Sequence, residues 1–479
     1  MESPILGGYS VSRSKTLADN RLVNLYAEVV SGKDGKAVAG LFGCPGLDLL
    51  GTVGPGPQRG SYTASTGTLY VVSGNGLYSV SSIFGSVLVG TLTTNTGVVQ
   101  MVDNGLQLLV VDGAAGWVLI FGTLTFTQVL PGAPFVTQPS LLAYQDGFAL
   151  VNLVGTEEWF QSNLNDFTTW SALNFTSADS APGGIVALYD LHREVWIFKT
   201  NRTEVWINAG LPNFAFQRLQ GVQIPQGCVA AYSVSRIGDS IVWLGADEQG
   251  QGVVYMSNGY QAVRISTHSI EFEIGKMSLI SDATAYVYQD TGHFFYVITF
   301  PTGNKTFCYD GSTQLWHERA AFENGTFSRH IGATFAYAYG KQVVGDFQNG
   351  NLYAFDNNTY TDNGAVRKWL RSWRALPPGK RVYEPMRFDS LLIDCQTGLS
   401  IPDGTTPQFV LRWSDDDGNN WSNEVWTDGN RVGNTGTRII YQRLGMTKRG
   451  GGLDRIFELS GTDPVPVAIV AAEVDAVPV

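Results

Sequence analysis

The 479-residue sequence predicts an all-β protein, with a β-propeller of six to eight blades followed by a C-terminal β-sandwich. Glycine is abundant, at 56 residues, and charged residues make up only 15% of the chain. Residues that are β-branched or aromatic recur in short bursts, which is typical of many short strands joined by tight turns. A similar group of strands also repeats along the first three-quarters of the chain, and this repetition indicates a propeller.

Residues 1–59 precede the repeats. We expect this N-terminal segment either to close the propeller or to contact neighbouring subunits. Its first eight residues lack the basic region and apolar run of a signal peptide, and no stretch of about 18 uncharged apolar residues occurs anywhere. These observations predict a protein that is synthesised in the cytoplasm and has no membrane-spanning segment.

Residues 60–356 carry the repeats and are predicted to form the propeller. In the first copy, the strand Thr68–Val72 is followed by a Ser-Gly-Asn-Gly turn, in which Asn75 and Gly76 both tolerate positive φ. The copies start roughly 38 to 54 residues apart, close to the repeat length of about 40 to 50 residues in propellers. Radial packing would cover both faces of each blade. The starts are Gly60, Val98, Leu141, Gly184, Val229, Ala283 and Ile331.

The composition and the repeat pattern of the sequence change after residue 356. Residues 357–366 are polar and are predicted to be a linker. Apolar strands return in residues 367–479, which we interpret as a β-sandwich domain. The clearest of these strands are Leu391–Asp394, Gln408–Trp413, Arg438–Gln442 and Val467–Ala471.

One short motif in the second domain is sharply defined. The stretch from residue 414 to residue 421 resembles the Asp-box hairpin (S-x-D-x-G-x-x-W) of sialidases and related propellers. In such a turn the Asp side chain caps backbone N–H groups and the Trp packs beneath. The motif occurs once and outside the propeller, so we interpret it as a structural turn. Its residues are Ser414, Asp416, Gly418 and Trp421.

The sequence offers no catalytic constellation. A sialidase needs an arginine cluster for the substrate carboxylate and paired acids, and the blades contain no repeated arginines. The five histidines are isolated, and the four cysteines lack the spacing of a zinc or redox site. We therefore predict that the protein is not an enzyme and has no cofactor or metal. The scattered candidate carboxylates are Glu157, Glu158, Asp190 and Glu204.

A basic segment stands out, because the chain has a net charge of −11 and a pI near 5.0. That acidity disfavours a protein that coats nucleic acid. The segment could still contact DNA phosphates or an acidic partner. The alternative is an inter-domain strand whose arginines stack on tryptophans and pair with acids. Its residues are Arg367, Lys368, Arg371, Arg374, Lys380 and Arg381, with Arg387 beyond and Trp369 and Trp373 between them.

Several short motifs, taken in order, resemble one family. They begin with Leu22–Tyr26 and Phe42–Leu47 and continue with Glu158-Trp159-Phe160 and Glu204-Val205-Trp206. The order ends with the hairpin between Trp413 and Trp421 and the turn Arg443-Leu444-Gly445. This order is similar to that of the packaged-DNA stabilisation proteins, or tail hub and nozzle proteins, of short-tailed bacteriophages.

The resemblance implies a structural protein of the virion. It implies a homo-oligomeric ring, expected to be a hexamer, that lies below the portal and adaptor proteins, continues the DNA channel and is closed by a tail needle or plug. Tailspikes or fibres would attach to it, and DNA would pass through without sequence-specific binding. Two other classes remain as alternatives, namely a glycan-binding or sialidase-like propeller and a receptor-binding adhesin.

Overall fold

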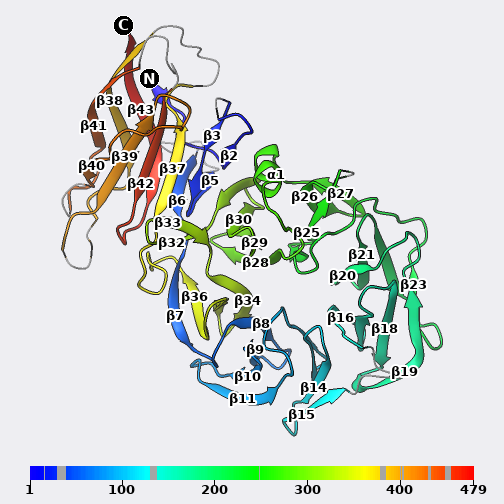
Figure 1. The fold of residues 1–479 in the computed structure, drawn as a ribbon. Coiled ribbons are helices and arrows are strands. Elements are labelled where there is room, and N and C mark those ends of the chain that lie inside the picture. The colour runs from blue at the N-terminus through cyan, green and yellow to red at the C-terminus, as the bar shows by residue number, and fades with distance from the viewer. Residues whose placement is uncertain are drawn as a thin grey trace.

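The computed structural model describes residues 1–15, 17–29, 39–129, 137–247, 249–377, 385–399, 401, 404–429, 433–447 and 455–479. Within these ranges the chain forms a ring of seven antiparallel blades of four strands each, with a β-sandwich beside it (Figure 1). Six blades are separate sheets, and the other continues into a nine-stranded sheet. The predicted fold class is confirmed, and the number of blades falls within the predicted six to eight. No helix in the described ranges has the length and apolarity to cross a membrane.

The first three blades follow one another along the chain, each starting at the centre of the ring and ending at its rim. The first comprises β8 (Gln58–Thr63), β9 (Leu69–Ser73), β10 (Gly76–Val80) and β11 (Ser86–Thr91). The second comprises β12 (Gln100–Asp103), β13 (Gln107–Val111), β14 (Gly116–Ile120) and β15 (Thr125–Val129). The third comprises β16 (Leu142–Gln145), β17 (Phe148–Asn152), β18 (Glu158–Asn163) and β19 (Asp166–Ser177).

The next three blades repeat this arrangement. The fourth comprises β20 (Ile185–Leu191), β21 (Glu194–Lys199), β22 (Thr203–Asn208) and β23 (Phe216–Arg218). The fifth comprises β24 (Ser235–Ile237), β25 (Ser240–Ala246), β26 (Gly252–Asn258) and β27 (Gln261–Arg264), and α1 (His268–Ile274) follows it. The sixth comprises β28 (Thr284–Asp290), β29 (His293–Phe300), β30 (Lys305–Asp310) and β31 (Leu315–Glu318).

The seventh blade joins the two ends of the propeller sequence. Its inner strands are β34 (Gly332–Ala338), β35 (Lys341–Asp346) and β36 (Asn351–Asp356), whereas its outer strand is β7 (Gly46–Thr52) from the N-terminal segment. Because β7 pairs with β36, the ring is held closed by hydrogen bonds between residues about 300 positions apart. A hydrophobic cluster lies between each pair of neighbouring blades around the ring.

The sandwich is built from both ends of the chain. One sheet has the order β41 (Ile439–Met446), β38 (Met386–Cys395), β43 (Ala468–Pro478), β6 (Ala39–Gly43) and β5 (Leu25–Val29), and β1 (Glu2–Ser3) also pairs with β43. The other sheet continues from the sixth blade. From β31 it runs through β4 (Leu22–Val23), β37 (Trp369–Arg374), β42 (Ile456–Gly461), β39 (Gln408–Ser414) and β40 (Val425–Asp428).

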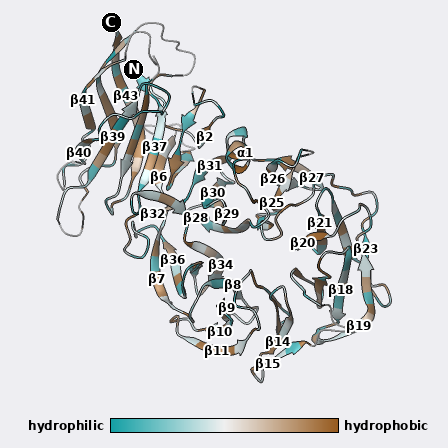
Figure 2. Ribbon diagram, in the orientation of Figure 1, coloured by the Kyte–Doolittle hydropathy of each residue, from teal (hydrophilic) through white to brown (hydrophobic). Residues whose placement is uncertain are grey.

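Two short hairpins complete the described elements. They are formed by β2 (Ser10–Val11) with β3 (Asp19–Asn20) and by β32 (Ala320–Glu323) with β33 (Thr326–Arg329). Figure 2 shows hydrophobic and hydrophilic residues intermixed along the strands of both domains, as expected for sheets with covered and exposed faces. All four cysteines are free and buried.

Candidate functional site at the junction of propeller and sandwich

The two domains share one continuous sheet. Strand β4 lies between them, parallel to β31 of the sixth blade and antiparallel to β37 of the sandwich. A single hydrophobic cluster also extends from the fifth and sixth blades into the sandwich, and it includes Tyr296, Trp316, Trp373 and Phe457. Backbone hydrogen bonds and packing therefore join the domains without a flexible hinge at this point.

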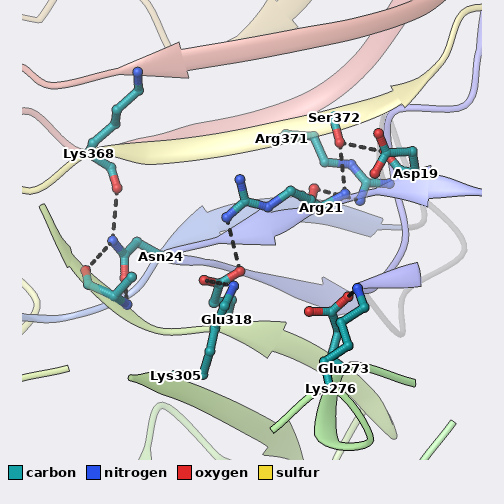
Figure 3. A network of polar contacts seen from close by, with 11 residues as sticks. Asp19, Arg21, Asn24, Glu273, Lys276, Lys305, Glu318, Lys368, Arg371 and Ser372 are labelled. Atoms are coloured by element: carbon teal, nitrogen blue, oxygen red, sulfur yellow. Dashed lines mark hydrogen bonds and ion pairs between the residues drawn. The ribbon is translucent and has the colours of Figure 1, made fainter. Parts of the chain in front are cut away.

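Asn24 directly follows β4, and its side chain reaches both domains (Figure 3). Its Nδ2 donates to the carbonyl of Ala320 and to that of Lys368, each at 2.8 Å, and its Oδ1 accepts from the Ala320 N–H at 3.0 Å. The residue is 1% exposed and has a φ of 54°, which asparagine tolerates better than most residues. Asn24 thus fixes the direction of the chain where it passes between the domains.

Glu318 carries the charge of this junction. Its side chain is 2% exposed and forms ion pairs with Arg21 of the N-terminal segment and Lys305 of the sixth blade, with a nitrogen–oxygen distance of 3.1 Å in each (Figure 3). Burial raises the pKa of the carboxyl group, but the two cations outweigh this effect, and the pKa is lowered overall. Glu318 therefore stays ionised in the folded protein at neutral pH.

Arg371 is the most enclosed of the described residues in the predicted basic segment. It is 1% exposed, and its guanidinium donates to the carbonyls of Ile5 at 2.6 Å, Leu6 at 3.2 Å and Gly8 at 3.3 Å. The neighbouring Ser372 Oγ donates to the carbonyl of Asp19 at 2.7 Å. The side chains of β37 therefore bind the backbone of the N-terminal segment inside the subunit.

The other predicted basic residues are distributed around this junction. Arg367 is 7% exposed, and Lys368 lies over the Phe322 ring at 5.3 Å. Arg374 donates to the carbonyl of Lys15 at 2.7 Å and pairs with Asp417 at 3.2 Å. Burial of Arg367 and Arg371 argues against a direct DNA contact in the subunit. Lys380 and Arg381 lie outside the described residues.

Arginine does stack on tryptophan in the sandwich, and in the part of the chain that the structure describes these arginines come from outside the predicted segment. Arg412 lies over Trp421 at 4.6 Å, and Arg455 lies over Trp413 at 5.2 Å. Arg455 also forms a bidentate pair with Asp415, at 2.7 and 2.9 Å. Arg387 pairs with Asp389 on the surface at 2.9 Å.

The Asp-box-like stretch forms a capped turn between β39 and β40. Asp416 accepts from the amide N–H of Asn420 at 2.7 Å, and Ser414 Oγ donates to Asp416 at 2.8 Å and accepts from the Gly418 N–H at 2.9 Å. These bonds, the Asn420 amide foremost, lower the pKa of Asp416 to about 2. Gly418 has a φ of 77°, and Trp421 closes the turn beneath Arg412.

Several carboxylates and one histidine of the blades pair with neighbouring side chains. Glu157 pairs with Lys199 at 2.8 Å, and Glu204 accepts from the indole N–H of Trp206 at 2.9 Å. His293 contacts Asp310 at 2.7 Å within the sixth blade. Among the described residues, no group of three His, Cys, Asp or Glu side chains is arranged to hold a metal ion.

The sequence alone does not indicate that Arg21, Asn24 and Glu318 form a site. Leu22–Tyr26 enters only as one of the motifs that carry the family resemblance. A weak signal exists at Glu318, because two adjacent charged residues, Glu318 and Arg319, lie at the end of a predicted strand. Arg21, one of the two partners of Glu318, lies almost 300 residues away, so local pattern does not reveal that pairing.

Two family models together match nearly the whole chain. The model described as "Bacteriophage P22 Gp10, beta-propeller" matches residues 1–360, and the model described as "Bacteriophage P22 Gp10, beta-sandwich" matches residues 369–477. No curated protein matches the sequence.

Solved structures resemble the chain weakly. The extracellular domain of a putative hybrid two-component system from B. thetaiotaomicron is 13% identical with a TM-score of 0.45, and the match covers 80% of this chain and 47% of that one. The N-terminal domain of Nup159 is 10% identical with a TM-score of 0.40, covering 70% and 99%. PorZ of the Porphyromonas gingivalis type-IX secretion system is 12% identical with a TM-score of 0.40, covering 80% and 46%.

Proposed function

Because the chain belongs to the bacteriophage P22 Gp10 family, whose members are structural proteins of the phage tail hub, we propose that it forms a hub or nozzle ring that retains packaged DNA and becomes the ejection conduit. The match of both family models, in the order propeller then sandwich, is the observation that carries this proposal. The protein is a component of the virion. A homo-hexameric ring below the portal and adaptor is the arrangement that we propose for it.

The construction of the subunit supports a mechanical role. Closure of the ring by β7 leaves no blade open at the point where the chain starts and ends the propeller. The continuous sheet through β4 fixes the sandwich to the sixth blade, so a force on one domain passes to the other through hydrogen bonds. Such a subunit would keep its shape under the pressure of packaged DNA.

The charge of the subunit supports passage rather than binding of DNA. Its net charge is −11, and two members of its most basic segment, Arg367 and Arg371, are buried. An acidic wall repels phosphates, whereas tight binding requires cations that displace counterions. We therefore infer that DNA slides through the ring without sequence-specific contacts. The same family membership leads us to propose that the protein has no catalytic activity.

The proposed partners are the portal and adaptor above the ring, a needle or plug that closes it, and tailspikes or fibres at its side.

The decisive experiment compares particles assembled with and without this protein. We expect particles that lack it to fill with DNA and then lose it, as measured by nuclease-sensitive DNA, and added purified protein to prevent the loss. Stable DNA retention without the protein would contradict the proposal. Binding of sialosides by the purified protein would favour the glycan-binding alternative.

A further inference from the structure

Two consecutive blades are almost free of charged residues. Residues 49–145 contain three of them, Arg59, Asp103 and Asp112, and no histidine. At the chain average of 15% charged residues, a segment of this length would contain about 15. The segment includes the first two blades completely, so the depletion belongs to one region of the folded surface.

The three exceptions are all internal. Arg59 is 4% exposed and donates to the carbonyls of Gly97 at 2.7 Å and Gly74 at 2.9 Å. Asp103 is 6% exposed and accepts from the hydroxyl of Tyr62, and Asp112 is 5% exposed and caps the turn that follows it. The outer surface of the first two blades therefore presents no formal charge at neutral pH.

This uncharged surface also exposes large apolar side chains. On and before β11, Ile83 is 86% exposed, Val87 65% and Leu88 54%. In the second blade, Leu106 is 68% exposed and Leu124 is 58% exposed. Strands β11 and β15 contact each other at the rim, where Gly90 lies against the Phe126 ring. We call these five residues, Ile83, Val87, Leu88, Leu106 and Leu124, the neutral face.

An uncharged outer strand with exposed apolar side chains is unusual in a monomeric protein. Edge strands of monomers are commonly protected by charged residues, proline or bulges, because their free N–H and C=O groups can pair with another chain. Strand β11 has a bulge on its inner side but no charged residue or proline. In contrast, the rim strands β19, β23 and β27 of the following blades contain Asp166, Arg218 and Arg264.

The charge of the whole chain indicates what covers the neutral face. Two copies of this chain each carry −11 and repel each other where their charged surfaces approach within a Debye length of about 8 Å. Contact through the neutral face brings no further like charges together, and interface cores are depleted of charged residues. We propose that the neutral face docks a second copy of this chain. The inference rests on the proposed ring and names the surface that builds it; a ring requires each copy to bind its neighbour through one repeated contact.

The test places a positive charge in the neutral face and at a matched position elsewhere. Val87→Lys and Leu88→Lys, singly and together, alter rim side chains that are more than half exposed, so the fold should be unaffected. The control is Val263→Lys on the rim strand β27, where Val263 is 42% exposed and precedes Arg264. Self-association of the full chain is measured by sedimentation equilibrium from micromolar to near-millimolar protein, with circular dichroism to verify folding.

We expect the unaltered chain and Val263→Lys to associate as concentration rises, and the double variant to bind at least about tenfold more weakly. A chain that stays monomeric throughout, or a double variant that associates normally, overturns the proposal. So does a double variant that self-associates normally but loses binding to purified portal and adaptor, because another virion protein then covers the face. The particle assay is independent of these results: if DNA is retained without the protein, the proposed function fails even where self-association through the neutral face is found.

Discussion

The junction makes a quantitative prediction at Glu318. In Glu318→Gln the side chain keeps its shape but loses the charge that holds Arg21 and Lys305, both at 3.1 Å. Breaking a buried ion pair typically costs about 3 to 5 kcal/mol. Here the side chains of Arg21 and Lys305 are 28% and 33% exposed, so water partly replaces the lost partner. We therefore expect a loss of about 3 kcal/mol in the free energy of unfolding, at the lower end of that range.

The stabilisation by Glu318 should also depend on pH, and this dependence can be measured separately. The pKa of Glu318 is lower in the folded than in the unfolded protein, so its stabilisation is fully present above the unfolded pKa of about 4.3 and is lost as the pH falls through the folded value. The difference between the original chain and Glu318→Gln should therefore shrink in acid. Urea unfolding followed by tryptophan fluorescence at pH 7 and pH 3.5 measures both effects. The control is Glu323→Gln on the exposed end of β32, and a Glu318 variant as stable as this control would refute the reasoning.

Three further predictions concern other parts of the structure. Burial lowers the pKa of His317 to about 3, so between about pH 6.5 and pH 3 the unfolded chain binds a proton at this residue that the folded chain does not. In His317→Leu the unfolding free energy should therefore fall less steeply with decreasing pH in that range, by up to about 1.4 kcal/mol per pH unit. An unchanged slope would contradict this. A Cβ on Gly46 would lie 2.1 Å from the carbonyl oxygen of Thr359, so Gly46→Ala should destabilise the seventh blade by more than about 2 kcal/mol in denaturant unfolding. The control is Gly122→Ala, where a Cβ would meet nothing within 4 Å, and it should change the free energy of unfolding by less than about 0.5 kcal/mol. Asp416→Ala should speed hydrogen exchange at the Asn420 amide, which it caps, while exchange in the propeller stays the same; equal protection of Asn420 in both proteins would count against the assigned turn.

The blades could be located from the sequence because their signals are local. Each is a run of short strands whose turns are fixed by residues that tolerate positive φ, and the predicted starts at Leu141, Gly184, Ala283 and Ile331 lie within one residue of the inner strands. The start at Val229 precedes β24 by six residues, because the preceding loop also has apolar residues. Local pattern thus suffices wherever a strand pairs with its neighbour in the chain.

The junction could not be predicted in the same way. Pairing of β7 with β36, of β1 with β43 and of β4 with β31 and β37 joins positions hundreds of residues apart, and nothing in a two-residue strand such as Leu22–Val23 specifies such a partner. The basic segment illustrates the same limit. Its charge is evident in the sequence, but only the fold shows that Arg371 lies beneath the carbonyls of Ile5, Leu6 and Gly8.

The placement of β43 has a consequence for the newly made polypeptide. This strand lies between β38 and β6 and also pairs with β1, although it is translated more than 400 residues after both β1 and β6. Until residues 468–478 emerge, β1 has no partner in this sheet and β6 pairs only with β5, and long-range pairing of this kind is slow. A product terminated before residue 468 would leave the edges of β1, β6 and β38 without this partner and open to proteases.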